Sequence, residues 1–142
     1  MDDELHEMAA NLHSVSIRML RKLRHEDEEI GLSQPRLSAL SVVVFAGPLS
    51  LAELAAAEQV KPPTMSRIVE ALVEDRLVTR DAVPEDRRSV RIAATEKGRR
   101  LMEKGRERRV QALSERLVGL ASSERRALAR GIELLERIMR ST

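Results

Sequence analysis

Three side chains near the middle of the sequence have the chemistry to bind an anion or the edge of a base. Thr64, Ser66 and Arg67 directly follow the pair Pro62-Pro63. Short hydroxyls bond to phosphates and base edges, and an arginine can donate to guanine O6 and N7 together. Because proline is tolerated in the first turn of a helix, we expect these side chains at the exposed start of a helix.

A second cationic group follows in the run Glu85-Asp86-Arg87-Arg88. A narrow minor groove concentrates negative potential and attracts inserted arginine side chains. Asp86 can hold one guanidinium group in position by a charge-assisted hydrogen bond. Taken alone, such a run is typical of a solvated turn, but beside a helix-turn-helix it predicts contact with DNA.

The basic side chains are concentrated in the same part of the chain. The 142 residues carry a formal net charge of +2. Residues 61–109 hold 14 basic and 9 acidic side chains, whereas residues 1–60 hold 5 basic and 10 acidic ones. A basic middle segment indicates a local site for an anion. An arginine-rich solvated surface would give the same distribution.

Composition excludes several classes of protein. The chain has no cysteine, which excludes disulfides, thiolate metal sites and a catalytic cysteine. Phe45 is the single aromatic residue, so a protein that stacks bases on aromatic rings is nearly excluded. The acidic start does not resemble a signal peptide, and no apolar stretch approaches the ~20 residues of a membrane span. We expect a cytoplasmic protein without a membrane partner.

Catalysis and metal binding are not expected either. His6, His13 and His25 are too few and too widely spaced to supply the roughly four ligands of a zinc site. No HExxH, P-loop, GxSxG or GxGxxG pattern occurs. The sequence therefore predicts no cofactor, no metal and no enzymatic activity.

Apolar periodicity places the two cationic groups within six helices and one hairpin. We expect a long helix that ends at Gly31, a second with its inner face at 37, 40 and 43–45, a short third at 51–57 and a fourth from Pro62 or Pro63 to about Asp75. Strands at 77–81 and 89–93 are expected around a long charged tip, followed by a fifth helix to about Leu120 and a sixth to Met139. The expected helix caps are Ser33, Ser50, Thr95, and Ser122 or Ser123.

A short helix, a tight turn and a second helix, followed at once by a basic hairpin, predict a mainly α-helical winged helix-turn-helix. The residues expected where the two short helices cross are apolar, and Ala55 is small where they approach closely. These residues are Leu54, Ala55, Val60, Met65 and Ile68. The terminal helices are too long and one-sided for the lobe alone, so we expect them to form a platform for dimerisation.

The chain resembles the MarR (multiple antibiotic resistance regulator) family of transcription factors over essentially its whole length. The run from Asp86 to Gly98 follows the family's wing pattern, which is Asp, any residue, Arg, five residues, Leu-Thr, two residues and Gly. Residues 62–69 resemble the family's recognition helix. The sequence departs from the family with Ala94 for Leu, Gln59 where Gly is common, and Lys61 in place of a capping Ser or Thr.

The resemblance implies a homodimeric repressor that binds double-stranded DNA at a pseudo-palindromic operator and is released by a small molecule, often anionic or phenolic. It implies that Arg88 enters the minor groove beside its orienting partner Asp86. The expected DNA contacts are Lys61, Thr64, Met65, Ser66 and Arg67 on the recognition helix, Asp86, Arg87 and Arg88 on the wing, and Ser33, Gln34, Arg36 and Ser50 on phosphates. The expected effector pocket draws on His13, Ile17, Leu20, Val43 and Phe45. The expected dimer interface contains Leu5, Met8, Leu12, Leu113, Leu117, Leu128, Ile132 and Leu135.

These expectations describe one domain over residues 1–142. Residues 33–98 form its DNA-binding lobe, and residues 1–30 and 99–142 form its helical dimerisation region. The alternative is a helical module that binds another protein and does not read DNA sequence. An adaptor of that kind has no need of two arginines on a projecting hairpin, so the basic segment 61–109 favours the DNA-binding interpretation.

Overall fold

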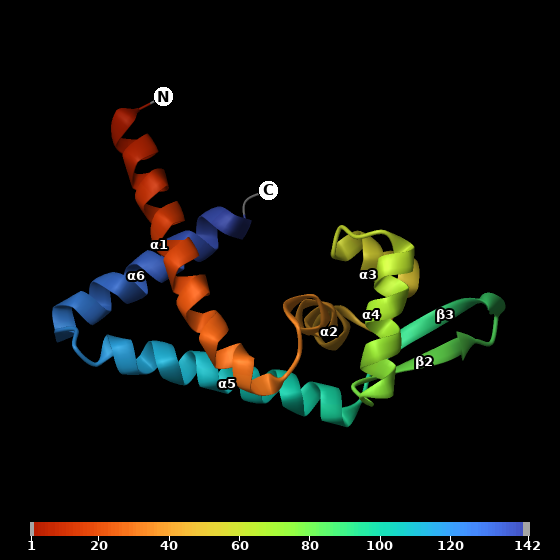
Figure 1. Cartoon of the computed structure of the whole chain (residues 1–142). Coiled ribbons are helices and arrows are strands. Elements are labelled where there is room, and N and C mark those ends of the chain that lie inside the picture. Colours follow the sequence, from red (N-terminus) through yellow and green to blue (C-terminus); the bar gives the residue numbers. More distant parts are fainter. Residues whose placement is uncertain (1, 141–142) are drawn as a thin grey trace. The chain divides into compact units, whose positions relative to one another are not determined.

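A computed structural model describes residues 2–140 and, for residues 86–89, the backbone only. Figure 1 shows mostly helices and one small sheet. The elements are α1 (Asp3–Asp27), the 3-10 turn η1 (Glu28–Ile30), α2 (Gln34–Ala46), β1 (Leu49–Ser50), α3 (Leu51–Ala57), α4 (Pro62–Glu74), β2 (Val78–Val83), β3 (Asp86–Ala94), α5 (Glu96–Leu117) and α6 (Ser122–Arg140). The described chain divides into two compact units, Met1–Arg108 and Arg109–Thr142. The expected boundary at residue 98, between the DNA-binding lobe and the dimerisation region, remains a prediction.

The core of the first unit lies between α2, α3, α4 and the sheet. Its largest fully buried side chains include Leu40, Leu54, Met65, Leu72 and Ile92. Each such side chain stabilises the fold by about 1.5–3 kcal/mol relative to an exposed one. This core fixes α3 and α4 against the sheet, and so it sets the geometry of the predicted helix-turn-helix.

The sheet has three antiparallel strands in the order β1-β3-β2. Its hairpin confirms the predicted wing, but the prediction of a long charged tip was wrong. The strands extend to Val83 and from Asp86, so the turn contains only Pro84-Glu85. A register irregularity between Ala82 and Val83 accommodates this tight turn. The short strand β1 was not predicted, because two residues carry no periodicity.

Helix α1 is a 25-residue helix whose start is capped by the Asp2 side chain, which accepts from the backbone N–H of Glu4. Asp27 is its one buried residue. Helix α1 ends at Asp27, four residues before the predicted stop, and the 3-10 turn η1 continues to Gly31, whose φ of 77° is a left-handed conformation that glycine adopts without a Cβ clash. Because Asp27 is the one buried residue of α1, the apolar stripe of this helix lies at the surface of the unit.

The second unit contains the end of α5 and the whole of α6. No residue of α6 is buried. The predicted caps Ser122 and Ser123 were wrong, because the helix begins at Ser122 and the Glu124 carboxylate accepts from the backbone N–H of Ala121. An apolar groove of about 350 Å³ lies within this unit. It is lined by Ser114, Leu117, Val118, Leu120, Arg125, Leu128, Ala129 and Ile132.

The expectation that Phe45 faces inward was also wrong, since 72% of Phe45 is exposed. Leu37, Leu40 and Val43 are buried on one face of α2. A helix turns about 100° per residue, so Phe45 lies about 200° from Val43 and points to solvent. In a short helix with apolar residues at adjacent positions, the sequence pattern does not identify which of them face the core.

No helix among the described residues is both long enough and apolar enough to cross a membrane.

Candidate nucleic-acid interface

Helix α4 presents one face to the core and the opposite face to solvent. Met65, Val69 and Leu72 are buried, whereas Thr64 and Arg67 are exposed. Ser66 is half-buried, and Lys61, at the N-cap position, is exposed and does not cap the helix with its side chain. The exposed start of α4 therefore carries two hydroxyls and two cations, which suit contacts with phosphates and base edges.

Met65 does not belong to this exposed group. It is completely buried and belongs to the hydrophobic core. It lies four residues before Val69 and seven before Leu72, so the three share one helix face. The prediction that Met65 contacts DNA was wrong, because the helical period turns it away from the face of Thr64 and Arg67.

The turn between α3 and α4 is fixed by backbone bonds. The N–H of Val60 donates to the carbonyl of Ala55 at 3.0 Å, and Gln59 has a φ of 55°. Glycine adopts that left-handed conformation without a Cβ clash, and here Gln59 occupies it. The Ser38 hydroxyl donates to the Glu58 carboxylate at 2.7 Å, which ties the turn to α2. The angle between α3 and α4 is thus held by one bond within the turn and by another that joins the turn to α2.

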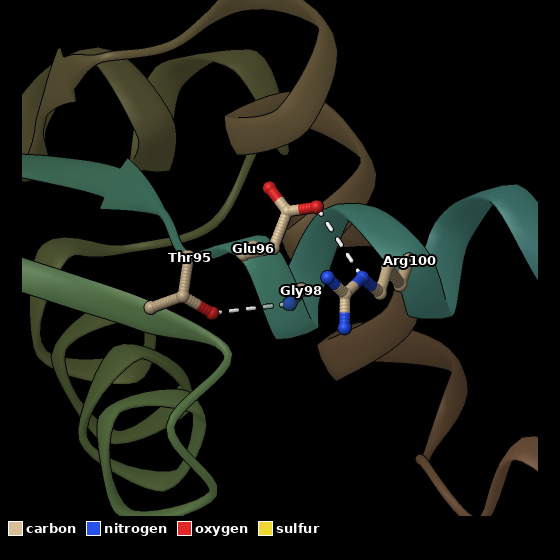
Figure 2. Close-up of polar contacts among 4 residues, drawn as sticks. All are labelled: Thr95, Glu96, Gly98 and Arg100. Carbon is tan, nitrogen blue, oxygen red and sulfur yellow. Dashed lines mark hydrogen bonds and ion pairs between the residues drawn. The ribbon is translucent and has the colours of Figure 1, made fainter.

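A second set of bonds joins the end of α4 to the start of α5. Thr95 makes two of them and also caps α5. Its hydroxyl donates to the carbonyl of Arg76 at 2.7 Å and accepts from the N–H of Gly98 at 3.0 Å, and its own N–H donates to the carbonyl of Leu77. The bond to Gly98 confirms Thr95 as the cap of α5, and Figure 2 shows it beside the Glu96–Arg100 ion pair. We refer to residues 75–77 and 95–98 as the junction.

Two further residues complete the junction. The Lys97 ammonium donates to the carbonyl of Asp75, the C-cap of α4, at 2.9 Å. A Cβ added to Gly98 would collide with the carbonyl of Leu77, so only glycine allows this close approach. The Thr and Gly of the wing pattern are therefore structural residues that fix the roots of the hairpin. The contact of Lys97 with the end of α4 was not predicted, because a lysine in the first turn of a helix carries no distinctive sequence signal.

The wing is the hairpin of β2 and β3, which extends away from α4 in Figure 1. The backbone of Asp86, Arg87 and Arg88 begins β3, and Asp86 pairs with Val83. The side chains of these three predicted contacts lie outside the described part of the structure. The backbone places them next to the turn, at the end of the hairpin that is farthest from the junction.

The residues expected to contact phosphates lie at the starts of α2 and α3. Ser33, Gln34 and Arg36 are exposed, and Ser33 occupies the N-cap position of α2 without a side-chain cap bond. Ser50 is half-buried, and its hydroxyl accepts from the N–H of Glu53 at 3.0 Å, which confirms the predicted cap. A hydroxyl that accepts one bond still has a proton to donate to a phosphate.

The residues expected in an effector pocket lie in different environments. His13, Ile17 and Leu20 are exposed on α1, Phe45 is exposed at the end of α2, and Val43 is part of the core. Val43 was therefore a wrong choice for a pocket-lining residue. Among the described residues, no three His, Asp or Glu side chains are grouped closely enough to hold a metal ion.

The residues expected at a dimer interface are accessible within their own units. Leu5 and Met8 on α1 are each 60% exposed. Leu12, Leu117, Leu128 and Ile132 are also exposed, and Leu113 and Leu135 are half-buried.

The short helix α3, its tight turn, the exposed face of α4 and the adjoining hairpin define a winged helix-turn-helix, the fold of a DNA-binding protein.

Comparison with known proteins agrees with the assignment of a winged helix-turn-helix. The MarR family profile matches residues 32–90. The uncharacterized HTH-type transcriptional regulator ML2140 of Mycobacterium leprae is 31% identical, over 90% of each chain. The uncharacterized HTH-type transcriptional regulator Mb0904 of Mycobacterium bovis is 33% identical, also over 90% of each chain. The chain belongs to the MarR family and is a DNA-binding transcriptional regulator.

Solved structures show the same fold. The transcriptional regulator Tm0710 of Thermotoga maritima matches with a TM-score of 0.84 and 23% identity over 94% of each chain. A MarR family protein of Bacillus stearothermophilus matches with a TM-score of 0.81 and 23% identity over 98% of each chain. MepR of Staphylococcus aureus, solved as a variant bound to an oligodeoxyribonucleotide, matches with a TM-score of 0.73 and 18% identity, over 94% of this chain and 98% of that one.

Proposed function

We propose that two copies of this chain form a repressor that binds a pseudo-palindromic operator. The observation that carries the proposal is the contrast between the exposed polar face of α4 and the exposed apolar faces of α1 and α6. Leu5 on α1 is 60% exposed and Ile132 on α6 is 49% exposed. Apolar stripes of this length are covered in stable proteins, and a second copy offers a self-complementary surface.

In this proposal α4 enters the major groove, and the wing reaches the adjacent minor groove. Lys61, Thr64, Ser66 and Arg67 contact base edges or phosphates from α4. Arg88 enters the minor groove, oriented by Asp86 and assisted by Arg87. Ser33, Gln34, Arg36 and Ser50 bind phosphates on either side. A dimer of such lobes spans half-sites about 34 Å apart, which is one turn of the duplex.

The oligonucleotide bound to MepR supports the DNA-binding part of the proposal, because the two chains share their fold. Release by a small molecule is the remaining part, and it is inferred from the family. It requires that the effector bind one dimer geometry more tightly than the other.

The deciding experiment is selection of bound sequences from a random duplex pool, combined with sedimentation of the protein and of its DNA complex. We expect inverted half-sites separated by one helical turn, bound by two copies. In a reporter whose promoter overlaps the selected site, the chain should lower expression. Arg67→Ala should change which half-site sequence is preferred.

Two results would contradict the proposal. A tight monomer that binds the whole selected site excludes the dimeric reader. Absence of salt-dependent binding to any duplex would instead favour the helical protein-interaction module, because neutralising phosphates makes affinity fall steeply with salt.

A further inference from the structure

Arg80 lies on the side of the wing that faces the helices. It pairs with Ile92 across the β2–β3 ladder, and Val78 precedes it by two residues on the same strand. Paired residues and residues two apart on a strand point to the same face of a sheet. Ile92 and Val78 are both in the hydrophobic core. The Arg80 side chain therefore starts from the core-facing side of the hairpin, which we call the inner face, and reaches solvent beyond the core.

Among the described residues, the ladder neighbours of Arg80 on the inner face are all apolar. Its neighbours there are Val78 and Ala82 on its own strand and Ile92, Val90 and Ala94 across the ladder. No ion pair or hydrogen bond joins its guanidinium group to another side chain in the described part of the chain. An arginine stem can cover an apolar strip while the charged end stays in solvent.

The opposite face of the same hairpin is arranged differently. Asp81 pairs directly with Arg91, so that arginine has an acidic residue across the ladder. The Arg91 guanidinium also donates to the carbonyl of Pro48 at 3.4 Å. Arg91 thus has a hydrogen-bond partner within the protein. The neighbouring Arg80 has only apolar ladder neighbours, and its charged end lies in solvent.

The inner face of β2 lies against α4. Strand β2 is an edge strand, and Val78 shares one hydrophobic core with Met65, Val69 and Leu72 of α4. If α4 occupies the major groove and the wing occupies the adjacent minor groove, the sugar-phosphate strand that separates the two grooves must pass between them. We propose that Arg80 binds a phosphate of this strand, an inference that rests on the proposed function.

The experiment measures binding of fluorescently labelled duplexes of roughly 30 base pairs, long enough for two half-sites. One duplex carries a site recovered by selection, and the other is a scrambled sequence of the same composition. Affinities of the wild type, Arg80→Ala, Arg80→Lys and Arg91→Ala are measured from about 0.05 to 0.3 M salt. Arg91→Ala is the matched control, because it removes the same charge from the other face of the hairpin. Thermal melting checks that each variant is folded.

One phosphate contact contributes about 0.9 to the slope of log affinity against log salt. Arg80→Ala should therefore reduce the slope by about 0.9 per bound lobe and lower the affinity per lobe about eightfold at 0.1 M salt and about fourfold at 0.2 M. The loss should be equal on both duplexes, since phosphates carry no sequence information. Arg80→Lys should keep the slope, and Arg91→Ala should leave it nearly unchanged.

Unchanged affinity and slope for Arg80→Ala, with the wild type binding normally, would overturn this inference and leave the proposed function intact. A loss confined to the selected duplex would also overturn it, because it would indicate base readout. If the wild type binds neither duplex, the proposed function itself fails.

Discussion

The DNA-binding lobe and the long terminal helices of this chain use apolar residues in opposite ways. In the lobe, residues such as Leu40 and Leu54 are completely buried. In α6 no residue is buried, although Leu128, Ile132 and Leu135 repeat at helical spacing. The lobe completes its hydrophobic core within one chain. The apolar faces of the terminal helices need a further surface, so the folding of the lobe and the assembly of the protein should respond to different mutations.

The largest effect should come from a charge placed on the apolar stripe of α6. If Ile132 is buried between two copies, Ile132→Asp leaves an unpaired carboxylate there, at a cost of about 3–5 kcal/mol. The dimer dissociation constant should rise by roughly 100-fold or more. Sedimentation equilibrium measures the change. Thermal unfolding of the DNA-binding lobe within the variant chain should stay as in the wild type.

The control for this variant is Arg126→Asp, which puts the same side chain on the opposite face of α6. On a helix of about 100° per residue, position 126 lies about 160° from Leu128 around the axis, so its side chain points away from the apolar stripe. If the two variants weaken self-association equally, the effect is one of charge alone, and the α6 stripe is not an interface.

The next largest effect should come from the core of the lobe. Leu40→Ala removes a completely buried side chain, so the free energy of unfolding should fall by about 2–5 kcal/mol. Urea denaturation at several protein concentrations measures it. Because the lobe core closes within one chain, the loss should be independent of concentration. A loss that disappears at high protein concentration would show that this core also depends on a second copy.

Local sequence patterns in both regions were sufficient to predict most of the helices and the hairpin. Elements with a long apolar period were predicted well: the helical turns that begin with α1 end at Gly31, and α4 begins at Pro62, one of the two expected starts. The wing was identified from a period of two and from the pattern ending in Thr95 and Gly98. These features depend on neighbours close in sequence, such as the caps Ser50 and Thr95 or the left-handed Gly31.

Two local features, the cap of α6 and the length of the hairpin turn, were predicted wrongly, and the other errors concern contacts between residues distant in sequence. Met65 was expected both among the apolar residues where the two short helices cross and among the DNA contacts, and only the first is correct, because it is buried in a core that includes Ile92. Phe45 was assigned to the core because it is apolar, although α2 already filled that face with Val43. The strand β1 exists only because Leu49 meets Ile92. Such partners are determined by the tertiary packing, which local periodicity does not reveal.

A smaller effect should come from the tip of the wing, which belongs neither to the core of the lobe nor to the apolar stripes of the terminal helices. Arg88→Ala should weaken binding to the selected operator by about 1–3 kcal/mol, the range for one specific contact. Self-association and melting should remain those of the wild type. Fluorescence anisotropy at moderate salt measures the loss. Unchanged affinity would remove Arg88 from the interface and, with it, the assignment of the wing to the minor groove.

The smallest effect should come from the junction, where the lobe passes into the long helix α5. Thr95→Ala removes both the cap of α5 and the bond to the carbonyl of Arg76. Loss of an N-cap costs about 0.5–2 kcal/mol, which urea denaturation can resolve. Thr95→Ser keeps the hydroxyl and should restore most of that stability. DNA affinity should follow the same order, because the junction fixes the end of α4. If Ser rescues stability and not affinity, the methyl group of Thr95, rather than its bonds, positions α4.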